Sequence, residues 1–126
     1  MPIHSKIDAE RRLIVATVFD EISDTDIIEA LNASISDPDF ERGFNVLSDH
    51  TRIARVITTE QVNLMVDHME SLSDHLAGAR WAIVTNSPAS YGMMRMLSVF
   101  AKRVPLELQV FRDADEANKW LASTKS

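Results

Sequence analysis

The alternation of apolar and polar residues changes along this chain, and each change predicts a different element. Ile3, Ser5 and Ile7 alternate with more polar neighbours over residues 3–8, which predicts an edge strand. Residues 13–19 are more apolar and rich in good strand formers. Since only a short polar turn separates the two segments, we expect them to pair as a hairpin.

Further along, apolar residues recur every three or four positions, which is the spacing of a helix with one buried face. Each of the segments with this spacing begins at a residue that can cap a helix, and these are Ser23, Thr58, Ser87 and Asp113. Ser23 and Thr58 are each followed three residues later by a side chain that completes a capping box. The sequence therefore predicts four helices.

Strands are expected between these helices. Residues 44–48 form one, which ends at Asp49, and residues 50–57 follow as a long irregular connection. Residues 80–86 contain an apolar run without alternation, as in a strand that is covered on both faces. Residues 105–112 alternate again. The order ββαβαβαβα predicts one α/β domain, residues 1–126, with a mixed five-stranded sheet whose later strands run parallel.

Composition narrows the function classes. Of 126 residues, 45% are apolar, which suffices for a core, and none is cysteine, which excludes disulfides and thiolate sites. Thirteen basic against nineteen acidic residues give a net charge of −6, which opposes binding to nucleic acid. No apolar run is long enough to span a membrane, and the first residues lack a signal-peptide layout. We expect a soluble cytoplasmic protein.

Three segments carry a resemblance to a known family. They are Val46-Leu47-Ser48-Asp49, Ala82-Ile83-Val84, and the final run from Val110 through Trp120-Leu121. With the element order, they resemble the SpoIIAA-like family over nearly the whole chain. That family has a STAS-type fold, similar to anti-sigma-factor antagonists and to lipid-carrying CRAL-TRIO domains.

The resemblance implies a non-enzymatic regulatory or protein-interaction domain. The second hypothesis for the function is a carrier or sensor of a small apolar or anionic ligand. The third is an enzyme of unknown class. The antagonists carry a phosphorylatable serine at the start of the helix after the third strand, in an Asp-Ser-x-Gly context. Here the region reads Ile57-Thr58-Thr59-Glu60-Gln61, without that serine or glycine. Thr58 and Thr59 keep a hydroxyl at a helix N-terminus and are candidate phosphosites.

A ligand site is predicted where the third and fourth strands end, because ligands gather at strand carboxyl ends in open α/β sheets. The candidate residues are Asp49, His50, Arg52, Arg55, Asn86, Ser87 and Ser90. Two arginines and the N–H groups of a helix N-terminus would suit a small anion. The structural alternative is a solvated loop with ordinary helix caps.

No residue has a compelling catalytic partner. His68 and His75 lie two helical turns apart, which is too far to share one metal ion. His50 is close to Ser48 and Asp49 in sequence, but the members of a catalytic triad are defined by their positions in space and not by sequence adjacency. We assign no catalytic residue, no metal site and no cofactor.

The helix after Ser87 has apolar residues on more than one face. Met93, Leu97 and Phe100 fit a core-facing stripe. The remaining apolar positions form an expected self-association surface, with interface candidates Tyr91, Met94, Met96 and Val99. The alternative is scattered surface apolar residues, which are common. We predict a homodimer with this helix at its interface.

Overall fold

The computed structural model describes residues 3–123 of the chain. Its strands are β1 (Ile3–Asp8), β2 (Leu13–Asp20), β3 (Asn45–Ile53), β4 (Arg80–Val84) and β5 (Glu107–Phe111). Its helices are α1 (Asp24–Ser36), α2 (Thr59–Ser71), the short α3 (Ser73–Leu76), α4 (Pro88–Phe100) and α5 (Ala114–Ala122), and the 3-10 turn η1 (Ala101–Arg103) follows α4. The predicted order of strands and longer helices is confirmed.

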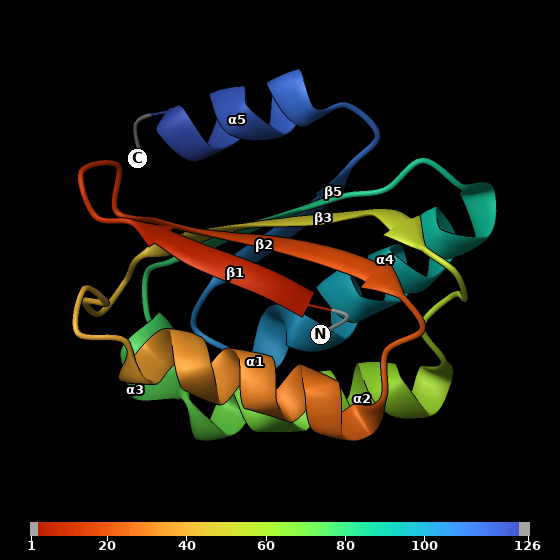
Figure 1. The fold of residues 1–126 in the computed structure, drawn as a ribbon, viewed down its shortest axis with the longest axis horizontal. Coiled ribbons are helices and arrows are strands. Elements are labelled where there is room, and N and C mark those ends of the chain that lie inside the picture. Colours follow the sequence, from red (N-terminus) through yellow and green to blue (C-terminus); the bar gives the residue numbers. More distant parts are fainter. Residues whose placement is uncertain (1–2, 124–126) are drawn as a thin grey trace.

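The five strands form one sheet in the order β1-β2-β3-β4-β5 (Figure 1). β1 is antiparallel to β2, which confirms the hairpin, and the later strands are parallel to β2. Helices α1, α2 and α4 lie against one face of the sheet, and α5 lies against the other (Figure 1). On that second face α5 contacts β4, β5 and β3.

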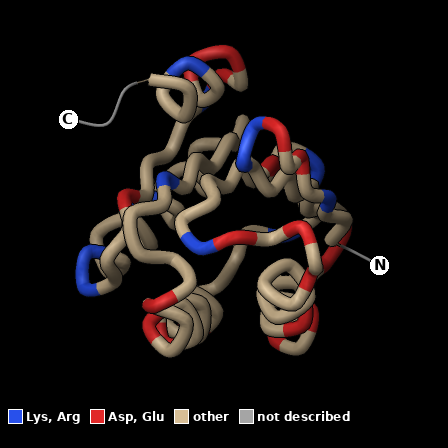
Figure 2. Tube along the Cα trace, turned by 90° about the vertical axis from the view of Figure 1, so that its left-hand side faces the viewer, with Lys and Arg blue, Asp and Glu red and all other residues tan. Residues whose placement is uncertain are grey.

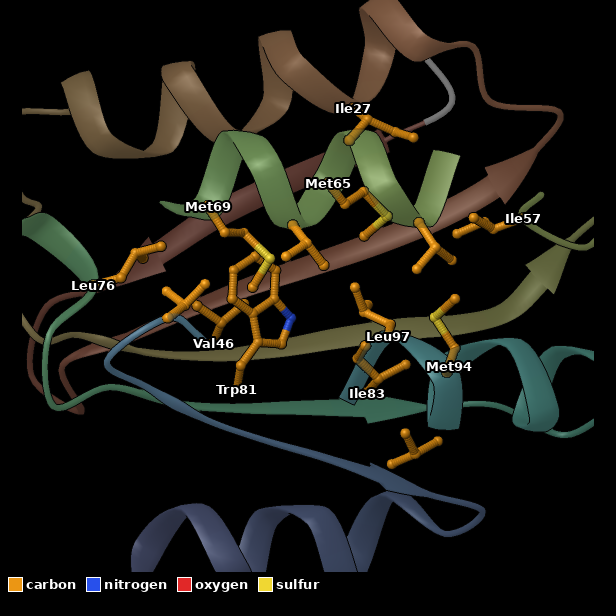
Figure 3. Packing of buried hydrophobic residues seen from close by; sticks show 14 of the residues in the cluster. Ile27, Val46, Ile57, Met65, Met69, Leu76, Trp81, Ile83, Met94 and Leu97 are labelled. Carbon is orange, nitrogen blue, oxygen red and sulfur yellow. The ribbon is translucent and has the colours of Figure 1, made fainter. Parts of the chain in front are cut away.

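Most of the core lies between the sheet and the helices α1, α2 and α4. Trp81 of β4 reaches into it beneath Met65 and Met69 of α2 (Figure 3). A smaller apolar cluster joins α5 to the opposite face of β2 and β4. All five residues of β4 are buried, as its unbroken apolar run predicts for a strand covered on both sides.

Local signals set the helix starts. The hydroxyls of Ser23 and Thr58 each accept an N–H from the residue three positions on, and the side chains of Asp26 and Gln61 bond back to the caps. Both capping boxes are confirmed. Ser87 caps α4, with proline in its first turn.

The end of β3 differs from the prediction. The strand continues to Ile53 and pairs with the far end of β2, so residues 50–53 are not part of a loop. A register shift lies there, because Thr17 pairs with Asp49 while Phe19 pairs with Arg52. Two residues of β3 therefore stand opposite one of β2, which is a β-bulge. The polar residues of this stretch concealed the strand, since strands are recognised by apolar alternation.

The buried stripe of α4 is also different. Ser90, Met94 and Leu97 are its buried positions, and the buried Ala101 at the start of η1 continues them, whereas Phe100 is 38% exposed. Met94, an interface candidate, is therefore a core residue with 1% exposure, and that assignment was wrong. The physical reason is that a buried serine extends the stripe at helical spacing, and an apolar pattern does not count serine.

Candidate functional site

A cavity of about 70 Å³ lies between α1 and the sheet. Residues of β1, β2 and β3 line its floor, α1 lines the opposite wall, and side chains of α2 and β4 contribute at the sides. A cavity needs about 10–15 Å³ of such volume to hold one water molecule, so this cavity is several times larger than one water requires. The cavity is partly open to solvent.

Small side chains create this space. Ser5 of β1 pairs with Ala16 of β2, and Ala16 pairs with Ser48 of β3, so the three form one row across the sheet. Ala30 and Ser34 of α1 line the cavity opposite this floor. Small residues on both walls leave a gap where larger side chains would interdigitate.

His50 lines the same cavity and is 3% exposed. Its Nε2 lies 2.8 Å from the Ser48 hydroxyl, and its Nδ1 is buried without a hydrogen-bond partner. Burial lowers the pKa of His50 to about 4, and the negative charge of Asp49 opposes that shift only weakly. The imidazole is therefore neutral at neutral pH, and its Nδ1 is free to form a hydrogen bond with a ligand.

The Ser48–His50 pair does not form a catalytic triad. Asp49 lies between them in sequence, but its carboxylate accepts hydrogen bonds from the N–H and hydroxyl of Thr51. The Nδ1 of His50 therefore lacks the acidic partner that orients a catalytic histidine. A histidine whose pKa is depressed to about 4 is also a weak general base at neutral pH. The arrangement is better suited to holding a ligand than to catalysis.

The walls of the cavity differ in exposure to solvent. Apart from the buried Ile27, the lining residues of β1 and α1, including Ile3, Ser5 and Ser34, are partly exposed, whereas those of α2 and β4 are buried. Ile27 is the single buried residue of α1, while α2 has four buried residues. By this comparison α1 is held by fewer fully buried side chains than α2.

Charged residues lie largely on loops and helices, of both signs (Figure 2). None of the residues that line the cavity is Lys, Arg, Asp or Glu. Its polar groups are hydroxyls of Ser5, Ser34 and Ser48, the His50 imidazole and the Trp81 indole. Among the residues 3–123, no group of three or more His, Asp or Glu is placed to hold a metal ion.

A model of the SpoIIAA-like family matches residues 13–122. The chain belongs to the SpoIIAA-like family. A solved structure, described as an uncharacterized protein of the DUF3478 family with a SpoIIAA-like fold from Shewanella loihica PV-4, superposes with a TM-score of 0.66. It shares 15% identity, over 95% of this chain and 94% of the other. At that identity it shows the fold alone. No curated protein matches the chain.

Membership of the SpoIIAA-like family confirms the resemblance seen in the sequence and supports a regulatory or interaction domain as the kind of protein. Within the part of the chain that the structure describes, no helix combines the length and apolar content that crossing a membrane requires.

The predicted ligand residues of this SpoIIAA-like chain are distributed over several surroundings. His50 faces the cavity, while Arg52 lines a separate surface hollow with Thr17 and Phe19. The exposed Arg55 pairs with Glu21 at 3.1 Å. At the end of β4, Asn86 is exposed, the Ser87 hydroxyl accepts the Ser90 N–H, and the hydroxyl of Ser90 is buried without a partner. Anion binding by these residues stays a prediction.

Thr58 and Thr59 are exposed at the start of α2. Thr58 already serves as the helix cap, because its hydroxyl accepts the Gln61 N–H at 3.1 Å. Phosphorylation at either residue stays a prediction. On α4, Tyr91 stacks under the Arg112 guanidinium, Met96 is half-buried and Val99 is 53% exposed.

Sequence reasoning missed most of the cavity. It named His50, but as part of a loop, and it did not single out Ser5, Ala16 or Ser34. The signal available was the occurrence of small residues at inward positions of β1, β2 and α1. That signal is weak, because small residues are common and the pairing of the three strands is needed to align them.

Proposed function

We propose that this protein binds a small, largely apolar ligand in the cavity between α1 and the sheet, as a carrier or sensor. The observation that carries the proposal is the row Ser5–Ala16–Ser48, which faces small residues of α1 and ends beside the unpartnered, buried Nδ1 of His50. An apolar pocket with a few convergent polar groups is the usual form of a small-molecule site.

The position of α1 gives a ligand a way to act on a partner. Since α1 forms one wall and has a single buried residue, a ligand that fills the cavity would favour one position of this helix. A ligand shifts a conformational equilibrium by its differential affinity for the two states. The proposal is therefore compatible with the regulatory kind of domain that family membership supports.

Filling the cavity should weaken ligand binding. In Ala16→Leu, a branched side chain enters the middle of the floor, and we expect apolar probes to bind at least about tenfold more weakly, because the added atoms occupy the ligand's space. Binding is measured by NMR titration with short-chain alkanols, alkanoates and alkanes. The organic extract of protein purified from its own host is compared by mass spectrometry.

Thr17→Leu is the matched control, because Thr17 is the next residue of β2 and points to the opposite face of the sheet. It should retain wild-type binding and any co-purifying molecule. If no probe shifts the signals of cavity residues in the wild type, and nothing co-purifies with it, the proposed function is wrong.

A second candidate function, association through α4, rests on a different observation. Val99 and Phe100 are 53% and 38% exposed, and together with the half-buried Met96 they leave an apolar area at the end of this helix. Exposed apolar residues on one helix are the kind of surface that self-association can cover, and a two-fold axis would place each copy against the other. We therefore keep the homodimer as a proposal with a revised set of residues.

We expect Val99→Glu to shift a wild-type dimer toward monomer without unfolding the chain, because burying one apolar side chain contributes roughly 1.5–3 kcal/mol. Light scattering at micromolar concentration measures the mass. Val56→Glu is the matched control, since Val56 is also an exposed valine, at 38%, but lies before α2. A wild-type protein with the mass of a monomer would refute the dimer, and a dimer insensitive to Val99→Glu would place its interface elsewhere.

A further inference from the structure

We infer that the Ser48–His50 pair makes the cavity select uncharged ligands with a hydroxyl or carbonyl group over carboxylates and plain hydrocarbons. The inference rests on the proposed function and names the class of ligand that the same site would take.

The pair can satisfy either kind of polar group. If the Ser48 hydroxyl donates to Nε2 of His50, then Nδ1 carries the hydrogen and can donate to a ligand carbonyl or hydroxyl oxygen. If instead Nε2 donates to Ser48, then Nδ1 can accept from a ligand hydroxyl. In both tautomers a buried nitrogen without a partner remains, and a ligand that supplies the missing hydrogen bond removes the cost of leaving it unpaired.

Charge excludes the common amphiphiles with an acidic head. No Lys or Arg lines the cavity, and Asp49, the acidic neighbour of His50 in sequence, directs its carboxylate to Thr51. A ligand carboxylate placed beside His50 would therefore be buried without a cation, which is costly. Because desolvation lowers the pKa of His50 to about 4, this side chain does not supply the missing positive charge at neutral pH.

Trp81 also lines the cavity, but its backbone lies further along the sheet than that of His50. Its indole Nε1 is also buried without a partner, but Trp81 pairs with Val46, four residues before His50. At about 3.3 Å per residue, the two backbone positions lie about 13 Å apart along the sheet. We assign the selective contact to Ser48 and His50, because the Nδ1 of His50 can donate or accept according to its tautomer, whereas the indole Nε1 can only donate.

The test compares 1-octanol, octanoate and heptane at neutral pH, by NMR titration of the ¹⁵N-labelled full chain. Wild-type protein should bind octanol at least about tenfold more tightly than octanoate, because the latter is buried unpaired. His50→Phe keeps a ring but no hydrogen-bonding nitrogen. It should weaken octanol about three- to tenfold, the usual worth of one neutral hydrogen bond, and leave heptane unchanged. Circular dichroism and the NMR spectrum establish that the variant is folded.

Each outcome separates this inference from the proposed function. Equal binding of the three probes in the wild type would overturn the selection and leave the cavity as a general apolar site. An unchanged preference for octanol over heptane in His50→Phe would assign the selection to other groups and also overturn the inference. If His50→Phe does not fold, the wild-type comparison and Ser48→Ala, which frees Nε2 of its partner, decide the same question. No binding of any probe would overturn the proposed function itself.

Discussion

Replacing Trp81 by alanine is expected to lower the free energy of unfolding by about 3–5 kcal/mol, the usual cost of removing a large buried side chain. Trp81 is 7% exposed and packs between the sheet and α2, where several core side chains surround it (Figure 3). Because its Nε1 has no hydrogen-bond partner, the loss comes from packing rather than from a broken hydrogen bond. Urea denaturation measures the change.

Trp120→Ala is the natural control, because Trp120 is the second tryptophan and lies on the other face of the sheet. It is half-buried and contacts Phe111 in a tilted arrangement, with 5.6 Å between ring centres. We expect a loss of about 1–2 kcal/mol there, from partial burial and one aromatic pair. Equal losses at the two positions would contradict the assignment of the main core to the α1, α2 and α4 side.

Lowering the pH from 7 to 4 should reduce stability by roughly 3 kcal/mol through His50 alone. Burial lowers the pKa of this residue from 6.5 to about 4 in the folded protein. Below pH 6.5 the unfolded chain binds a proton that the folded chain does not, so protonation favours unfolding. The contribution is fully present above pH 6.5 and is lost progressively as the pH falls toward 4.

Urea denaturation of wild type and His50→Phe across this range isolates the effect. Phenylalanine cannot titrate, so its stability should fall less steeply, and the difference between the two proteins should change by roughly 3 kcal/mol. His4→Gln, on the exposed side of β1, controls for the loss of a histidine as such. Parallel curves for wild type and His50→Phe would show that His50 is not held neutral by burial.

The two errors in the sequence interpretation have the same cause. Ser48 and His50 are buried in β3, and Ser90 is buried in α4. A prediction based on apolar residues treats buried polar positions as exposed. The sequence therefore predicted that β3 ends before His50, and it placed Phe100 in the buried stripe of α4. Buried polar residues are tolerated where they serve a site or find a partner, and composition does not reveal either condition.

The sequence by itself determined the elements and their order. Capping boxes at Ser23 and Thr58, the capped proline turn after Ser87, and the apolar run of β4 are local signals, because each depends on residues within one or two turns of the chain. The element order, together with three short segments of the sequence, also sufficed for the family resemblance.

Only the tertiary structure decided where a site lies. Ser5, Ala16 and Ser48 come from three strands, and they form one row because the register of two strand pairs aligns them. The bulge between Asp49 and Arg52 places Arg52 opposite Phe19, while His50 faces the cavity. Strand register and the position of α1 depend on contacts between distant segments, whose free energies are summed over the whole fold, so no local pattern specifies them.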